Sequence, residues 1–490
     1  MRRAVGPLVV VVALVTGAGA LVNGAGALAT GAGALATGTH PTTFTGARAV
    51  SPGVVRIEPG LIHPTTIHPA AEVDGGGPPT TATCEADYGV ACYSPGQLQK
   101  AYDLKPLFDK GVDGTGQTIV IVDAYGSPTI QTDLSVFDAA FGIPAPPSLT
   151  VIQPAGPVPP YVENSNREGW AGETDLDVEY AHSMAPGAAI LLVETPTNEN
   201  EGTSGFPQIV AAETYVIDHH LGGVISQSFS ATEESFPSAA SLLGLRSAYV
   251  DAAAQGITVL AASGDSGAAD VEHNGHTYYD VPVTSWPDSD PLVTGVGATQ
   301  LHLSATGHRT SRDSVWNDTY DPTTQKFITG KSGPSPLAGG GGLSVVFSRP
   351  SFQDGVQQVV GTQRGVPDIS MSGACNGAVD VYQGFPGQIG WFPTCGTSEA
   401  TPLFAGIVSL ADQMAGHPLG VINPALYSMS AAGAGGIVDV TKGNNTVTFT
   451  QHGSQTTVQG FAALPGYDLA SGVGTVDAAR FVPELADAAG

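Results

Sequence analysis

The sequence has few basic residues for its length. Its 490 residues include 17 Lys and Arg against 44 Asp and Glu, which gives a formal net charge of -27. Nucleic-acid phosphates and an anionic membrane surface would repel such a chain, so we exclude both as partners. The acidity fits a protein that works in acid, where many carboxylates are protonated. A charge that serves only solubility is equally compatible.

Long hydrophobic runs are also missing. The apolar run at 8–15 is too short for a membrane span, and no later stretch is longer and as apolar. It follows Arg2 and Arg3 and precedes small residues, so we interpret residues 1–20 as a signal peptide for secretion. We therefore expect an extracellular protein without stable membrane association.

The region after this signal has little that could form a core. Residues 17–37 repeat Gly-Ala-Gly-Ala-Leu three times, and the segment up to 83 is rich in Pro, Thr, Gly and His. We interpret residues 21–83 as a low-complexity leader or linker. From 84 the composition becomes globular, and we expect a single domain over 84–490.

Cysteine is scarce, with four residues in the whole chain. An even number of cysteines in an exported protein suggests disulfides. The pairing with short loops is Cys84 with Cys92 and Cys375 with Cys395. Free buried thiols are the alternative.

Buried β-branched runs alternate with helical segments along the globular part. This alternation predicts an α/β fold with a central, mostly parallel sheet. Active residues of such sheets lie on loops past the carboxyl ends of the strands. We expect strands at 117–123, 189–194, 224–228, 258–262 and 292–296, and helices at 131–141, 208–219 and 239–255.

A serine stands where a helix begins. The segment Gly396-Thr397-Ser398-Glu399-Ala400-Thr401-Pro402 runs into a helix-compatible apolar stretch at 403–414. The hydroxyl of Ser398 would be unshielded, and the first-turn N–H groups and the helix dipole would favour negative charge beside it. This makes Ser398 a candidate nucleophile, although a small polar cluster before a helix is more often an ordinary N-cap.

The stretch 172–184 is acidic and helical in pattern. Glu173 and Asp177 share the apolar side of this helix, whereas Asp175, Glu179 and His182 fall on the other side, which we expect to face solvent. Two close inward carboxyl groups cannot both ionise easily, so they would share a proton and could serve as a general base in acid. Acids near the positive end of the helix dipole are the alternative interpretation.

A third candidate is Asp265, in the loop Ser263-Gly264-Asp265-Ser266-Gly267 that follows a buried strand. An Asp in such a loop is most often a turn former that bonds its own backbone. If it were protonated, it could donate a hydrogen bond to an oxyanion.

In this order and spacing, the three stretches make the chain resemble the sedolisin family of serine-carboxyl peptidases, from about Tyr93 to the C-terminus. The resemblance implies a subtilisin-like three-layer fold and a catalytic set of Glu173, Asp177, Asp265 and Ser398. Family members usually carry a long folded propeptide, whereas only about 60 low-complexity residues follow the signal here, and Cys395 stands where the family often has Ser.

The resemblance also implies a Ca²⁺ site near the C-terminus. Its ligands would be the carboxylates and backbone carbonyls of a set of five residues, an all-oxygen cage that suits Ca²⁺. The set is Asp439, Val440, Leu464, Gly466 and Asp468.

These motifs together predict a monomeric, secreted serine-type endopeptidase that hydrolyses protein or peptide substrates in acid. Ser398 would attack, Glu173 would accept its proton, Asp177 would orient Glu173, and Asp265 with the Ser398 N–H would stabilise the oxyanion. The strand at 224–228 is a candidate for edge pairing with substrate. The alternatives are a non-catalytic secreted binding protein with the same fold, and a transpeptidase or esterase that uses the same serine.

Overall fold

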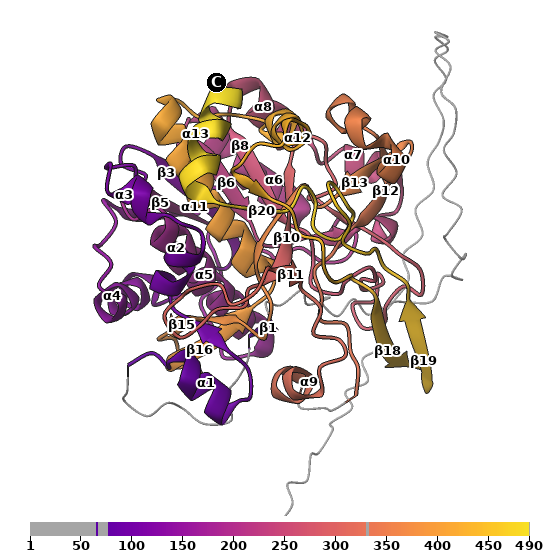
Figure 1. Ribbon diagram of the computed structural model, residues 1–490, viewed down its shortest axis with the longest axis horizontal. Helices are drawn as coiled ribbons and strands as arrows, with labels where there is room; N and C mark the ends of the chain where they lie inside the picture. Colours follow the sequence, from indigo (N-terminus) through magenta and orange to yellow (C-terminus); the bar gives the residue numbers. More distant parts are fainter. Residues whose placement is uncertain (1–64, 67–76, 330–332, 490) are drawn as a thin grey trace, which may run out of the picture. The chain divides into compact units, whose positions relative to one another are not determined.

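The computed structural model describes residues 65–66, 77–329 and 333–489 (Figure 1). The expected signal peptide and the Gly-Ala-Gly-Ala-Leu repeats lie outside these residues. Short elements β1 (Thr65–Thr66) and α1 (Thr81–Asp87) begin within the expected leader, and β1 pairs with β16 (Gly390–Cys395).

A mostly parallel sheet forms the centre of the described chain, as the alternating pattern predicted. Its strands are hydrogen-bonded in the order β11-β10-β8-β6-β3-β5-β4, and β14 also pairs with β10. Every pairing in it is parallel except that of β10 with β11. The strands are β3 (Thr118–Ala124), β4 (Leu149–Ile152), β5 (Ala189–Thr195), β6 (Val224–Gln227), β8 (Thr258–Ala262), β10 (Thr294–Gln300), β11 (Ser314–Val315) and β14 (Ile369–Ser372).

Side chains of β3 alternate between two hydrophobic cores, because successive residues of a strand point to opposite faces. Ile119 and Ile121 pack into the core that contains helices α5 (Ser165–Met184) and α11 (Thr397–Ala415). Val120 and Val122 pack into a second core with α6 (Phe206–Asp218) and α8 (Ser247–Gln255). The sheet is therefore covered by helices on both faces, which gives the expected three layers.

The remaining elements surround these layers. The other helices are α2 (Pro95–Ala101), α3 (Lys105–Phe108), α4 (Ile130–Phe141), α7 (Ala239–Leu243), α9 (Pro322–Thr329), α10 (Gln357–Val360), α12 (Asn423–Ala432) and α13 (Ala478–Ala489), with 3₁₀ turns η1 (Glu233–Ser235) and η2 (Ser351–Val356). The other strands are β2 (Cys92–Tyr93), β7 (Ala231–Thr232), β9 (Ser285–Trp286), β12 (Gly342–Ser348), β13 (Gln363–Val366), β15 (Ala378–Gln383), β17 (Ile437–Val438), β18 (Val447–Gln451), β19 (Ser454–Val458) and β20 (Thr475–Val476).

Two sequence-based boundaries were wrong. The helix expected at 239–255 is interrupted at Gly244, so α7 and α8 are separate. The strand expected at 292–296 is β10, which runs from Thr294 to Gln300 because the residues that follow 296 still pair with β14 and β11. The helices expected at 131–141 and 208–219 are confirmed within two residues by α4 and α6.

The strand proposed for substrate pairing is not an edge strand. Residues 224–227 of β6 are hydrogen-bonded to β3 on one side and to β8 on the other. Their backbone groups are therefore occupied, and edge pairing with a peptide at this strand is excluded. Only the residues that follow its carboxyl end remain available to the site.

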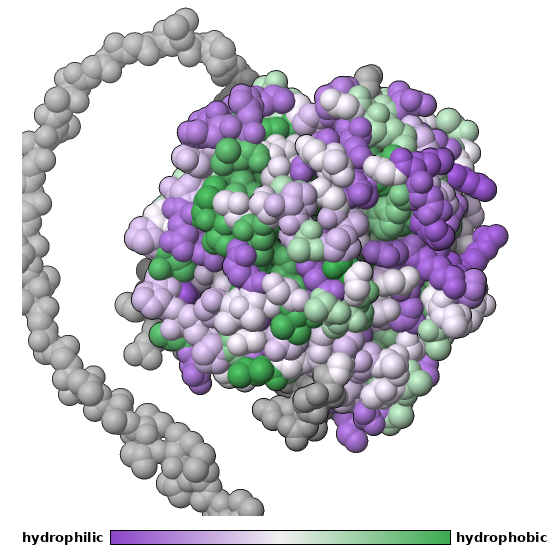
Figure 2. Space-filling view, turned by 90° about the vertical axis from the view of Figure 1, so that its left-hand side faces the viewer, coloured by the Kyte–Doolittle hydropathy of each residue, from purple (hydrophilic) through white to green (hydrophobic). Residues whose placement is uncertain are grey.

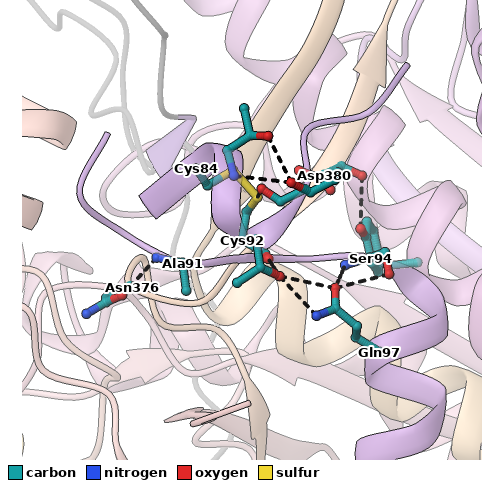
Figure 3. Close-up of a disulfide and its surroundings, with 11 residues drawn as sticks. Cys84, Ala91, Cys92, Ser94, Gln97, Asn376 and Asp380 are labelled. Atoms are coloured by element: carbon teal, nitrogen blue, oxygen red, sulfur yellow. Dashed lines mark hydrogen bonds between the residues drawn. A yellow bond between two sulfur atoms is a disulfide. The ribbon is translucent and has the colours of Figure 1, made fainter. Parts of the chain in front are cut away.

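All four cysteines form the two short-loop disulfides, Cys84–Cys92 and Cys375–Cys395. The second one ends one residue before Gly396 and ties the turn that precedes Ser398 to the loop after β14. Asp380 of β15 lies buried beside the first disulfide (Figure 3). Among the described residues these three are the one group with metal-ligand spacing, but a disulfide leaves no thiolate to bind a metal.

The described surface mixes polar and apolar side chains. On the face drawn in Figure 2, apolar residues gather in one patch that hydrophilic residues surround. No helix among the described residues is both long enough and apolar enough to cross a membrane.

Candidate active site

Ser398 is the second residue of α11 and lies almost completely buried. Gly396 precedes the helix with a φ of +133°, a conformation that favours glycine. Pro402 has no N–H, so the carbonyl of Ser398 lacks its usual partner four residues along the helix. The hydroxyl of Ser228, the residue after β6, lies 3.5 Å from that carbonyl. The motif thus fixes where the serine stands and links it to the end of β6.

Glu173 and Asp177 lie one turn apart on α5 and are both fully buried. The hydroxyl of Ser228 donates to Asp177 Oδ1 at 2.9 Å. Burial raises the pKa of Glu173 well above its ordinary value, and the nearby Ser398 hydroxyl opposes that shift. Both oxygens of Glu173 are buried without a hydrogen-bond partner, so they are free to accept a proton. Catalytic contacts are often long before substrate binds.

A third carboxyl group, Asp123 at the end of β3, belongs to the same cluster. Burial raises its pKa to about 7, and the nearby Thr174 hydroxyl opposes the shift. After burial, its charge is the largest influence that raises the pKa of Glu173 and of Asp177. Three acids this close cannot all be ionised, so they hold shared protons in the acid range.

Asp265 is oriented by the residue beside the candidate nucleophile. Its Oδ1 accepts the N–H of Thr397 at 2.7 Å and the Thr397 hydroxyl at 2.8 Å. Its Oδ2 is buried without a hydrogen-bond partner. Burial raises the pKa of Asp265 to about 6. A Cβ at Gly396 would come within 2.6 Å of Oδ2, so a glycine is needed there.

The opposite side of α5 does not face solvent, which corrects the expectation from the sequence. Asp175, Glu179 and His182 are fully buried, because α4, α2 and β15 cover this side of the helix. Glu179 accepts the N–H of Tyr382 at 3.1 Å, and His182 Nε2 lies 3.3 Å from Asp138 Oδ1. His182 does face away from the Glu173–Asp177 pair, as predicted.

The residues expected to bind Ca²⁺ come together at one turn. Asp439 Oδ2 accepts the N–H of Gly466 at 3.0 Å, and Asp468 Oδ2 accepts the N–H of Leu464 at 2.9 Å. Asp468 Oδ1 also accepts the N–H groups of Ala470 and Ser471. Asp439 is exposed, whereas Val440 and Asp468 are buried. The donor set is all oxygen, and both carboxylates retain lone pairs, so the residues fit a hard cation.

Sequence reasoning placed Glu173, Asp177, Asp265 and Ser398, and the fold brings all four to one region. It did not assign Asp123, Ser228 or Thr397 a part in the site. Asp123 carried a usable signal, since it is an acid at the carboxyl end of a buried parallel strand. Ser228 and Thr397 carried none, because a hydroxyl residue after a strand or at the start of a helix is common.

Comparisons with known proteins agree with this arrangement. The model of the subtilase family matches residues 164–453. Kumamolisin from Bacillus sp. (strain MN-32) is 33% identical over 402 residues, which cover 80% of this chain and 63% of kumamolisin. Sedolisin from Pseudomonas sp. (strain 101) is 28% identical over 422 residues, which cover 86% of this chain and 65% of sedolisin. This chain therefore spans less than two thirds of the length of either curated relative.

A solved structure is similar over most of the chain. It is Pseudomonas sedolisin (serine-carboxyl proteinase) complexed with two molecules of pseudo-iodotyrostatin. The TM-score is 0.67 at 26% sequence identity, and the match covers 82% of this chain and all of that one. The subtilisin-like α/β fold expected from the sequence is confirmed.

Proposed function

Because this chain belongs to the subtilase family, as a member of its sedolisin type, we propose that it is a serine-carboxyl endopeptidase that cleaves peptide bonds in acid. The observation that carries the proposal is that the start of α11, with Ser398, packs against the side of α5 that carries the buried Glu173 and Asp177. The hydroxyl of Ser228 joins the two helices, at 2.9 Å from Asp177 Oδ1 and 3.5 Å from the Ser398 carbonyl. The histidine of α5, His182, lies beside Asp138 of α4 instead. A carboxyl base next to a serine predicts acyl transfer that operates at low pH.

In the first step, Ser398 Oγ attacks the scissile carbonyl and its proton passes to Glu173. Glu173 must be ionised for this, while its neighbours Asp177 and Asp123 hold protons or share one. The hydroxyl of Ser228 holds Asp177 in place. Glu173 then returns the proton to the leaving amine, and water hydrolyses the acyl-enzyme by the reverse route.

Asp265 would stabilise the negative oxygen that forms in this step. Its Oδ1 is occupied by two donors from Thr397, so a proton on the carboxyl resides on the unpartnered Oδ2. Below about pH 6 this O–H is a donor fixed one residue from the nucleophile. Together with the N–H of Ser398, it forms the oxyanion hole.

A calcium ion would be held at the turn near the C-terminus. The carboxylates of Asp439 and Asp468 and the carbonyls of Val440, Leu464 and Gly466 would bind it. Its role would be to fix the segments around 439 and 464–468 to each other, because residues far apart in the chain meet only there. It would take no part in the reaction.

We also propose that the protein is exported and acts as a monomer on protein or peptide substrates. The two disulfides support export, because such bonds persist in oxidising compartments. The expected signal peptide and the processing of the leader stay predictions.

The direct test is hydrolysis of a quenched fluorescent peptide from pH 3 to pH 8 by wild type, Ser398→Ala and Glu173→Gln. Activity should be confined to acid in the wild type and lost in both variants. An aldehyde peptide inhibitor should label Ser398, located by mass spectrometry. Equal activity at acidic and neutral pH, or labelling of another residue, would refute the proposal.

A further inference from the structure

A cleft of about 200 Å³ opens beside the site, among residues that the proposed mechanism does not use. The loop after β3 forms one wall, and the proline-rich loop before α5 forms another. We call it the Arg167 cleft and define it by Tyr125, Gln153, Tyr161, Arg167 and Glu194. Its volume suits a single amino-acid side chain rather than a folded partner.

Arg167 provides the cation of this cleft. Its side chain is 7% exposed, and its guanidinium lies 4.0 Å from the ring centroid of Tyr125. Nη2 donates to the carbonyl of Pro159 at 2.6 Å, whereas Nε is buried and has no partner. A buried guanidinium N–H without an acceptor is costly, and Arg167 lines the cleft, so the cleft is where an acceptor for this guanidinium would arrive with a ligand.

Glu194 is not a hydrogen-bond acceptor for the guanidinium of Arg167. Its Oε2 accepts from Gln153 Nε2 at 2.7 Å. Its Oε1 lies against the turn after β3, where a Cβ at Gly126 would come within 1.9 Å of it. Burial raises the pKa of Glu194, and the hydrogen bond from Gln153 and the charge of Arg167 only partly oppose that shift, so acid favours the neutral carboxyl while Arg167 keeps its charge.

The cleft and the candidate base are both attached to α5. Arg167 precedes Glu173 by six residues, which corresponds to about 9 Å along the helix axis. An extended peptide advances about 3.3 Å per residue, so a substrate would cover this axial separation with two or three residues. Tyr125 is likewise two residues beyond Asp123, which belongs to the carboxyl cluster.

We propose that the Arg167 cleft is a substrate subsite that takes a carboxylate of the peptide, two or three residues from the cleaved bond. The guanidinium of Arg167 would donate to the carboxylate, and Tyr125 and Tyr161 would pack against the apolar stem of the ligand. The carboxylate is that of an Asp or Glu side chain or that of the peptide's C-terminus. This inference rests on the proposed peptidase function, because the ligand is the substrate.

The test uses matched peptides that differ only by Glu or Gln at one position, each prepared as a C-terminal acid and as an amide. Near pH 5 a peptide Glu is largely ionised, since its pKa is about 4.3. Wild type should cleave the favoured carboxylate peptide with a kcat/KM about tenfold above its neutral partner, mainly through KM. A difference at the Glu position identifies a side-chain carboxylate, and a difference only between acid and amide identifies the C-terminus.

Arg167→Gln should remove this preference while it leaves cleavage of the neutral peptide in place. Arg167→Lys keeps the charge but loses the planar fork, so it should retain part of the preference. Circular dichroism checks that each variant folds; if Arg167→Gln does not, the Lys variant decides. Equal cleavage of all four peptides by wild type, or an unchanged preference in a folded Arg167 variant, would overturn the proposal.

A binding measurement separates this inference from the proposed function. Fluorescence anisotropy of labelled peptides with the Ser398→Ala protein needs no catalysis. If wild type cleaves no peptide, the peptidase proposal fails, yet tighter binding of the carboxylate peptide still supports the subsite. If peptides are cleaved but carboxylate and neutral peptides bind equally, the subsite alone is refuted.

Discussion

The two sides of α5 carry carboxyl groups that are equally buried but differently placed. Glu173 and Asp177 face Ser398 and Ser228, whereas Asp175 and Glu179 face α4 and β15. Burial raises the pKa of all four groups. Burial and a raised pKa therefore do not distinguish a catalytic acid from a structural one.

The difference between the two sides is the presence of a candidate nucleophile. Glu173 lies near the hydroxyl of Ser398, and neither of its oxygens has a hydrogen-bond partner. Glu179 accepts a backbone N–H from a strand, a bond that fixes β15 to the helix. A carboxyl becomes a base when its spare lone pairs face a group that reacts.

Replacing one acid on each side of α5 is the most direct test of this difference. Glu173→Gln should lower kcat/KM by about 10²–10⁴-fold, because the amide cannot accept the proton of Ser398. Glu179→Gln is the matched control, since its amide oxygen still accepts the Tyr382 N–H, and it should retain nearly full activity. Peptide hydrolysis at acidic pH measures both. Similar losses in the two variants would remove the functional distinction between the sides.

Asp265 lies outside α5 and gives a second test of which buried acids take part in the reaction. Asp265→Ala should lower kcat by about 10²–10³-fold, the usual cost of one oxyanion donor. Asp265→Asn keeps an N–H donor that needs no protonation, so it should lose less and should become less sensitive to pH near 6. The pH profiles of kcat for wild type and both variants decide this. A profile for the Asn variant identical to that of wild type would contradict an oxyanion role for a protonated Asp265.

A buried acid of α6, on the opposite face of the sheet from α5, tests whether a buried acid far from Ser398 affects stability alone. Glu213 of α6 has no hydrogen-bond partner, and burial raises its pKa from 4.5 to about 8. The folded chain keeps this proton up to about pH 8, while the unfolded chain releases it above about pH 4.5. Stability should therefore be greatest below pH 4.5 and fall as the pH rises to 8, by on the order of a few kcal/mol from this group.

Glu213→Gln should flatten that decline without changing activity at acidic pH. Thermal unfolding at several pH values between 4 and 8 measures the slope. An equally steep loss in the variant would assign the pH dependence to other buried acids, such as Asp133, whose pKa burial raises to about 6.

The smallest effect is expected at the turn near the C-terminus, where one of the two acids, Asp439, is exposed. If Ca²⁺ binds there, a chelator should lower the Tm of wild type by about 2–5 °C. Asp439→Asn should have the lower Tm already and should not respond to the chelator. Asp439 is the better choice for substitution because Asp468 also accepts several backbone N–H groups. If the chelator leaves the Tm of wild type unchanged, the calcium site is contradicted.

The sequence predicted the position of the candidate serine better than it predicted which sides of α5 are buried. The Gly-Thr-Ser-x-x-x-Pro segment predicted a serine at a helix start, and α11 begins at Thr397. The prediction for α5 was half wrong, because an amphipathic analysis assumes that the side opposite the apolar stripe faces water. Here other elements cover that side, so Asp175, Glu179 and His182 are buried as well.

Substrate pairing at 224–228 failed for a related reason. A β-branched run indicates that a strand is buried. Whether the strand is central or at an edge of the sheet depends on which strands lie beside it. The order that places β6 between β3 and β8 is a property of the whole topology. The sequence did not predict the Arg167 cleft either, because its walls come from segments up to about 70 residues apart that meet only in the fold.

By itself, the sequence predicted the alternation of strands and helices, offered the short-loop pairing of the cysteines and named the candidate reactive groups. These follow from local spacing and from the chemistry of single side chains. Only the tertiary structure decided which buried acids meet Ser398, that Asp123 joins them, and that α5 has no solvent side. The reason is that pKa values and contacts depend on neighbours that are distant in the chain.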